Sequence, residues 1–123
     1  MTNDQKEQAA AANAMIKAVY DEQMAEINGR EYCFTSTVHK TRRKIYAFFS
    51  RAAPLLAVGD MSFLDWPEFD NIEAMICDMV LVNGMQISKQ PKHWDKCPED
   101  YMTFISTAMS VISYPFFQGK SGG

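Results

Sequence analysis

Residues 38–53 carry the most regular pattern in the chain, and it is the pattern of an amphipathic α-helix. At 100° per residue the apolar side chains share one face: Val38, Thr41, Ile45, Phe48, Phe49 and Ala52. Four cations share the opposite face: Lys40, Arg43, Lys44 and Arg51. Arg42 falls on the apolar side, so we expect its stem to pack in the core while its guanidinium binds a carboxylate or a helix-end carbonyl. Since proline does not fit a helix interior, Pro54 predicts an end at about Ala53.

Three further segments predict helices. Residues 3–28 are rich in helix-forming side chains, with Asn3 or Asp4 as N-cap and Gly29 where a left-handed residue ends a helix. Their apolar stripe comprises Ala12, Met15, Ile16, Val19, Gln23 and Ile27. Residues 65–82 begin with an acidic capping box, Asp65 to Glu68, and carry the inward stripe Phe69, Ile72, Met75, Ile76, Met79 and Val80. Residues 98–115 lie between two prolines and carry Tyr101, Phe104, Ile105, Ala108 and Ile112.

The segments between these helices are short. Arg30 to Thr37 favours an extended chain, and Thr35, Ser36 and Thr37 are candidate N-caps for the helix that follows. Asn83-Gly84 fits either a type I′ hairpin turn or a helix C-cap, and the helical period before it favours the cap. The sequence therefore predicts a mostly α fold. We expect a compact bundle of about four helices, with a short strand pair or an irregular extended segment around residues 30–37.

Length and composition limit the class of protein. The 123 residues suffice for one domain over residues 1–117, followed by a flexible tail at 118–123. No apolar run approaches the roughly 20 residues that cross a bilayer, and a polar start, Met1 to Glu7, is unlike a secretory signal. We therefore expect a cytoplasmic protein without membrane contact. Its three dispersed cysteines, Cys33, Cys77 and Cys97, are expected to be reduced thiols that pack as small hydrophobes.

Opposite charges occupy two consecutive blocks. Residues 32–59 contain no Asp or Glu, whereas residues 52–88 contain no Lys or Arg. Either the two blocks neutralise each other within one molecule, or they form a dipolar surface that docks head-to-tail on a second copy or on another charged partner. The candidate residues for this contact are Lys40, Arg43, Lys44, Arg51, Asp70 and Glu73. Trp94, in a polar loop, either folds back on the core or anchors a partner.

Catalytic and metal-binding patterns are weak in this chain. His93 and Cys97 stand four residues apart, but no CxxC pair accompanies them and the other potential zinc ligands are scattered. The sequence contains no GxGxxG, P-loop or HExxH motif. We therefore expect a protein that binds other proteins, with no catalytic residues, metal or cofactor. The basic helix 38–53 allows a second hypothesis, a small nucleic-acid-binding regulator, although the net charge of −3 argues against it.

Two long segments carry a family resemblance. GREYCFTSTVHKTRRKIYAFF and HWDKCPEDYMTFISTAMSVISYPFF resemble the tail assembly chaperones of lambda-like long-tailed bacteriophages, and the resemblance extends from Gly29 to the C-terminus. It implies a late protein of the host cytoplasm, absent from the mature virion. Such a chaperone binds the tape measure protein, and the tail tube protein with it, during tail assembly. The alternative to a chaperone is that the protein is a minor structural subunit of the phage tail.

The C-terminal residues bear on the same family. Its members are also made as an extended product by ribosomal frameshifting, where codons for Gly and Lys read as a run of G followed by a run of A. Gly119-Lys120 matches that pair and lies in the predicted tail, where an extension leaves the core undisturbed. The resemblance therefore implies that Gly119 and Lys120 mark a frameshift site.

Overall fold

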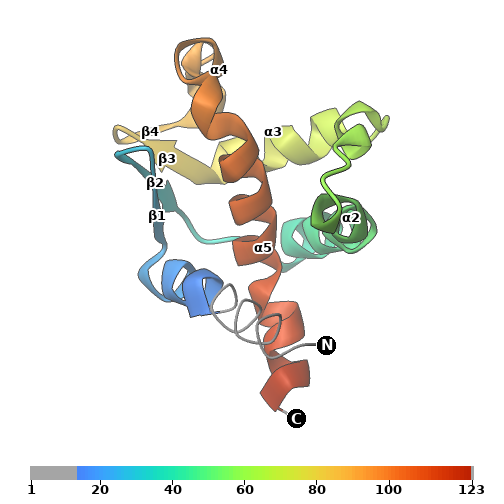
Figure 1. The fold of residues 1–123 in the computed structure, drawn as a ribbon. Helices are drawn as coiled ribbons and strands as arrows, with labels where there is room; N and C mark the ends of the chain where they lie inside the picture. The colour runs from blue at the N-terminus through green and yellow to red at the C-terminus, as the bar shows by residue number, and fades with distance from the viewer. Residues whose placement is uncertain (1–13, 123) are drawn as a thin grey trace.

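The computed structural model describes the backbone of residues 14–122 and the side chains of residues 14–116. Residues 14–22 are helical. The elements that follow are β1 Met24–Ile27, β2 Arg30–Phe34, α2 His39–Ala57, a 3₁₀ turn Ser62–Asp65, α3 Phe69–Met79, β3 Val80–Val82, β4 Met85–Gln86, a 3₁₀ turn Ile87–Lys89, α4 His93–Lys96 and α5 Pro98–Gly122. Figure 1 shows α5 running the length of the molecule, with β1 and β2 on one side and α2 on the other.

The described part of the chain is mostly helical, and a small antiparallel sheet accompanies the helices. The strands stand in the order β1-β2-β3-β4. The prediction of a mostly α fold with a strand around residues 30–37 is confirmed by β2. The finer prediction of a helix bundle needs correction, because the sheet forms one side of the core and joins two segments that the sequence assigned to helices.

Two Asn-Gly turns account for this difference. Asn28 and Gly29 have φ of 51° and 82°, and Asn83 and Gly84 have φ of 57° and 77°. Positive φ at both central residues is the geometry of a type I′ hairpin turn, whose twist matches that of the strands. The prediction of a helix C-cap at Asn83-Gly84 is therefore wrong, since β3 pairs with β4 across this turn.

The first predicted helix also ends early. It stops at residue 22, where Gln23 takes a φ of 57°, and the chain turns into β1. Ala25 and Ile27 are buried while Glu26 is exposed, which is the period-2 alternation of a strand. The predicted caps Asn3 and Asp4, and Ala12 of the stripe, lie outside the described residues. Met15 of the same stripe is 69% exposed.

Proline positions do not end the helices as the sequence predicts. α2 continues through Pro54 to Ala57, and α5 continues through Pro115 to Gly122. A proline removes one backbone hydrogen bond and bends a helix, but tertiary packing can offset that loss. In α2 the residues just after Pro54, Leu55 and Leu56, pack against the core. The flexibility of residues 118–123 stays a prediction.

The predicted caps are replaced by other contacts. α3 begins at Phe69, after Pro67, and Glu68 makes no side-chain cap bond, so the acidic capping box is not formed. α2 likewise has no side-chain cap. Thr35 and Thr37 turn instead toward Met79, whose carbonyl and sulfur accept their hydroxyls at 2.7 Å and 3.3 Å. These bonds join the start of α2 to the end of α3.

One connected core lies between the sheet, α2, α3 and α5. Its fully buried side chains include Tyr32, Ile45, Phe63, Ile76, Phe104, Ile105 and Met109. The apolar face predicted for residues 38–53 is confirmed by buried Ile45, Phe48 and Ala52, although Val38 is 68% exposed. Arg42 binds a backbone carbonyl, since its Nη1 donates to the Ile112 carbonyl at 2.7 Å, but this carbonyl lies within α5, in the turn before Pro115, and not at a helix end as predicted.

Candidate protein-binding groove

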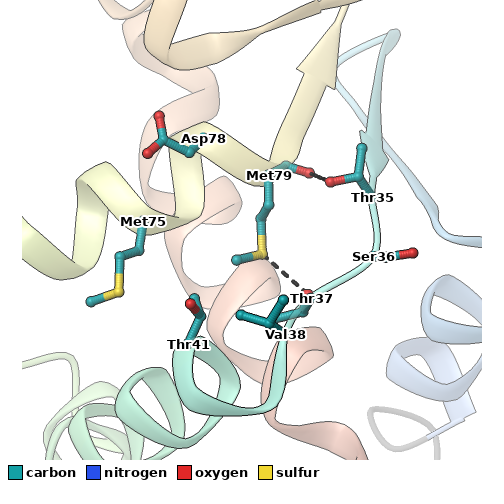
Figure 2. Close-up of a pocket in the computed structure, with 8 residues that line it drawn as sticks. All are labelled: Thr35, Ser36, Thr37, Val38, Thr41, Met75, Asp78 and Met79. Carbon is teal, nitrogen blue, oxygen red and sulfur yellow. Dashed lines mark hydrogen bonds between the residues drawn. The ribbon is translucent and has the colours of Figure 1, made fainter.

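A groove runs between α2 and α3, formed by two adjoining hollows that share Met75. The first, of about 250 Å³, lies at the start of α2 and is lined by Thr35, Ser36, Thr37, Val38, Thr41, Met75, Asp78 and Met79 (Figure 2). The second, of about 310 Å³, is lined by Lys44, Ala47, Phe48, Arg51, Glu68, Asn71, Ile72 and Met75. We call the two together the α2–α3 groove.

The floor of this groove is apolar and its edges are polar. Phe48 and Ile72 are 2% and 5% exposed and form the base of the second hollow. Figure 2 shows the half-buried Met75 side chain extending from α3 toward α2. Its thioether has three rotatable bonds, so it adapts its shape to an apolar group placed against it. On the opposite side of the first hollow, the Thr37 hydroxyl donates a hydrogen bond to the Met79 sulfur and so fixes the Met79 side chain (Figure 2).

Arg51 closes one end of the groove. Its Nη1 lies 2.6 Å from Glu68 Oε1, and its guanidinium stands 4.5 Å from the centre of the Trp66 ring. The Arg51 hydrogen bond lowers the pKa of the Glu68 carboxyl below its ordinary value. This pair joins the basic block to the acidic block inside one molecule. Arg51 therefore has an intramolecular partner.

The other predicted cations are placed differently. Lys40, Arg43 and Lys44 are exposed on α2, and none makes an ion pair with another residue among those whose side chains are described. We call these three residues the α2 cationic stripe. Lys44 lines the groove, so the stripe and the apolar floor are adjacent.

The predicted acids separate in the same way. Asp70 is exposed in the first turn of α3. Glu73 is half-buried and accepts a hydrogen bond from the Tyr101 hydroxyl of α5. Burial and this bond together raise the pKa of Tyr101. Glu73 thus ties α3 to α5.

Trp94 is half-buried and its ring packs against Tyr32, Tyr101 and Phe104, with centroid distances of 6.2, 5.2 and 5.0 Å. Most of its ring surface is therefore used within the fold. Gly119 and Lys120 belong to the last turns of α5, and their side chains lie outside the described set.

The structure also contains a buried polar cluster that sequence reasoning missed. Asp100, in the first turn of α5, is fully buried. Its carboxylate accepts hydrogen bonds from the Tyr32 hydroxyl at 2.6 Å, from Asn28 Nδ2 at 2.7 Å and from the Arg30 guanidinium at 3.1 Å. His93 Nε2 lies 2.9 Å from the same Tyr32 hydroxyl. The donors all come from the β1–β2 hairpin, so no local pattern around Asp100 reveals the cluster.

The electrostatics of this cluster follow from burial and pairing. Burial alone raises the pKa of Asp100, but the bonds from Tyr32, Asn28 and Arg30 more than offset it and hold that pKa below its ordinary value. Burial also raises the pKa of Tyr32 and lowers the pKa of His93. Because Asp100 and Tyr32 have no exposed surface, the cluster is placed to join the hairpin to α5 rather than to meet a substrate.

Two classes of site are absent from the described part of the chain. No three His, Cys, Asp or Glu side chains gather there as a metal ion would require. No described helix has the length and apolar character to cross a membrane. Comparison with protein-family models, with curated proteins and with solved structures finds no match to this chain.

Proposed function

We propose that this protein is a non-catalytic assembly chaperone that binds a segment of another protein in the α2–α3 groove. The observation that carries the proposal is the apolar floor of Phe48, Ile72 and Met75 beside the exposed α2 cationic stripe. The groove extends along α2 from Thr41 to Arg51, a distance of about 15 Å along the helix axis, which matches about three turns of a partner helix. An amphipathic helix fits such a groove through side chains at i, i+3, i+4 and i+7.

The resemblance to tail assembly chaperones supplies the partner in this proposal. The tape measure protein is the client, with the tail tube protein as a second one, and the setting is the host cytoplasm before the virion is complete. A long client with apolar stripes aggregates unless those stripes are covered. Binding of one stripe in the groove of each chaperone copy would cover it until assembly proceeds.

The test is a binding measurement with the purified tape measure protein and the variant Met75→Glu. Glu at this position places a carboxylate on the apolar floor, and we expect affinity to fall at least about tenfold by calorimetry. Met85→Glu is the matched control, because Met85 is 49% exposed on β4 and does not line the groove. If Met75→Glu binds as the wild type does while its circular dichroism is unchanged, the groove is not the binding site.

The exposed stripe of Lys40, Arg43 and Lys44 also suits phosphate contacts, so a nucleic-acid-binding regulator is the second candidate. A gel-shift titration with duplex DNA at rising salt separates the two. DNA binding that weakens steeply with salt and requires the stripe but not Met75 would favour the regulator. Detection of the protein in purified particles by mass spectrometry would favour a minor structural tail subunit. A GGGAAA-type run at the Gly119-Lys120 codons, with an overlapping −1 frame, would support the chaperone family.

A further inference from the structure

Within residues 14–116, one face of the sheet packs against the core and the other does not. Ala25, Tyr32 and Val82 share a cross-strand row and are buried. The residues that alternate with the buried ones point to the other face: Met24, Glu26, Glu31, Cys33 and Leu81. Glu26, Glu31 and Cys33 are exposed, and Met24 and Leu81 are half-buried. We call this surface the outer sheet face.

Two glutamates lie directly opposite each other on this face. Glu26 of β1 and Glu31 of β2 are register partners, and both are exposed. Like charges directly opposite in an antiparallel pair are destabilising. The neighbouring cation, Arg30, is already engaged by Asp100 at 3.1 Å and Glu99 at 3.6 Å. Among residues 14–116, neither Glu26 nor Glu31 has an ion-pair partner.

An apolar row runs beside the two glutamates. Met24, Cys33 and Leu81 are successive register partners across β1, β2 and β3, and Leu81 in turn faces Gln86 of β4. The outer sheet face thus combines a pair of unneutralised carboxylates with a strip of apolar surface. It is suited to a partner that brings two cations and a small apolar group.

The α2 cationic stripe has that composition. Lys40 and Lys44 stand four residues apart, so their Cβ atoms are about 5–6 Å apart on one side of the helix. Opposed residues in an antiparallel pair have Cβ atoms about 4.5–5.5 Å apart, so the two lysines match the spacing of Glu26 and Glu31. Ala47 is exposed on the same side, one turn further on, and its small side chain leaves room for Met24 or Leu81.

We propose that the outer sheet face of one copy binds the α2 cationic stripe of a second copy, with Glu26 and Glu31 of the first paired to Lys40 and Lys44 of the second. The contact joins two unlike surfaces, so it propagates into rings or open arrays instead of closing as a two-fold dimer. It also relieves the repulsion between the two glutamates. The acceptor is therefore the sheet, in place of the acidic segment that contains Asp70 and Glu73. The contact requires no client, so it can be tested with the chain alone. Lys44 and Ala47 also line the α2–α3 groove, so a second copy on the stripe and a client in the groove compete for this edge of α2.

Sedimentation velocity of the purified full chain tests this contact. At low salt we expect the sedimentation coefficient of the wild type to rise with concentration, and at 0.5 M salt we expect it to stay at the monomer value because the charges are screened. Two variants each lose one surface: Glu26→Gln with Glu31→Gln, and Lys40→Gln with Lys44→Gln. Each alone should associate about tenfold more weakly. Mixed in equal amounts, they retain one intact pair of surfaces and should form a capped dimer and nothing larger.

Two controls match these variants in charge. Asp65→Asn with Asp70→Asn removes two exposed acids of the acidic segment, and Lys89→Gln with Lys92→Gln removes two exposed cations outside α2. Both should associate as the wild type does. The glutamate variant should also melt slightly higher than the wild type as a monomer, which shows that it folds. The inference is overturned if the wild type stays monomeric at low salt, if the mixture forms no dimer, or if the acidic-segment control abolishes association.

Discussion

Replacement of Asp100 by asparagine tests how the sheet is joined to α5. The change keeps the volume of the side chain and removes its charge. Asp100 is fully buried and accepts bonds from three side chains, and each hydrogen bond to a charged group contributes about 1.5–3 kcal/mol. Loss of one partner of a buried charged pair costs about 3–5 kcal/mol.

We expect the lower end of that range for this site. Water reaches Arg30, whose side chain is 36% exposed, and the Tyr32 hydroxyl keeps His93 as a partner at 2.9 Å. Asp100→Asn should therefore lower the free energy of unfolding by about 3 kcal/mol, a large part of the about 5–15 kcal/mol typical of a domain. At about 4 °C per kcal/mol, the melting temperature should fall by about 12 °C.

Equilibrium urea unfolding measures this effect, and Glu99→Gln is the matched control. Glu99 is exposed in the same turn of α5, so its change should stay within about 0.5 kcal/mol. The pKa of Asp100 is lowered in the folded state, so its stabilisation is present above its ordinary pKa of 3.8 and is lost as the pH falls through the folded value. The gap between wild type and Asp100→Asn should therefore be equal at pH 7 and pH 5 and close below about pH 4. The reasoning is refuted if Asp100→Asn costs no more than Glu99→Gln, or if the gap has already closed at pH 5.

Three smaller predictions concern other positions. Burial lowers the pKa of His93, so the unfolded chain binds a proton more readily than the folded one and stability falls as the pH drops below 6.5. His93→Gln should therefore reduce the change in the urea midpoint between pH 7 and pH 5. Gly84 has a φ of 77°, so Gly84→Ala should cost about 1 kcal/mol by thermal unfolding, and an unchanged melting temperature would contradict the hairpin. The buried Ser113 hydroxyl has no hydrogen-bond partner in the part of the chain that the structure describes, so Ser113→Ala should raise stability by about 1 kcal/mol in the same assay.

The helices were predicted best where their pattern is local. The face of α2 that carries Ile45 and Phe48 and the stripe that carries Lys40 and Lys44 both follow from a period of 3.6 residues. The start of α5 at Pro98 follows from the preference of proline for the first helical turn. These features need no knowledge of the rest of the chain.

β3 was predicted poorly because one of its partner strands is distant. β3 pairs with β2 through Phe34 and Val80, which are 46 residues apart in the sequence. The helical period that runs up to Asn83-Gly84 favours a helix, and pairing with the distant strand β2 overrides that local preference. β1 was missed for another reason: its partner β2 follows directly across the Asn28-Gly29 turn, but its residues favour helix.

The candidate site divides in the same way. The sequence identified the cations of α2, but the groove beside them depends on where α3 lies, and Met75 forms its floor only because α3 packs against α2. The sequence also did not identify Glu68 as the partner of Arg51 or Tyr101 as the partner of Glu73, since in each pair the two residues lie in different segments of the chain.

Taken alone, the sequence determined that the chain is mostly helical, which face of α2 is buried and which is charged. Those are properties of consecutive residues and of the helix period. The tertiary structure decided that two Asn-Gly pairs are hairpin turns, that Asp100 is buried among donors from the hairpin, and that Glu26 faces Glu31 across two strands. The burial of Asp100 depends on donors 68 to 72 residues away in the sequence. The two hairpins are local, but β2 of one pairs with β3 of the other, so strand register and buried charge are set by the tertiary structure rather than by local preference.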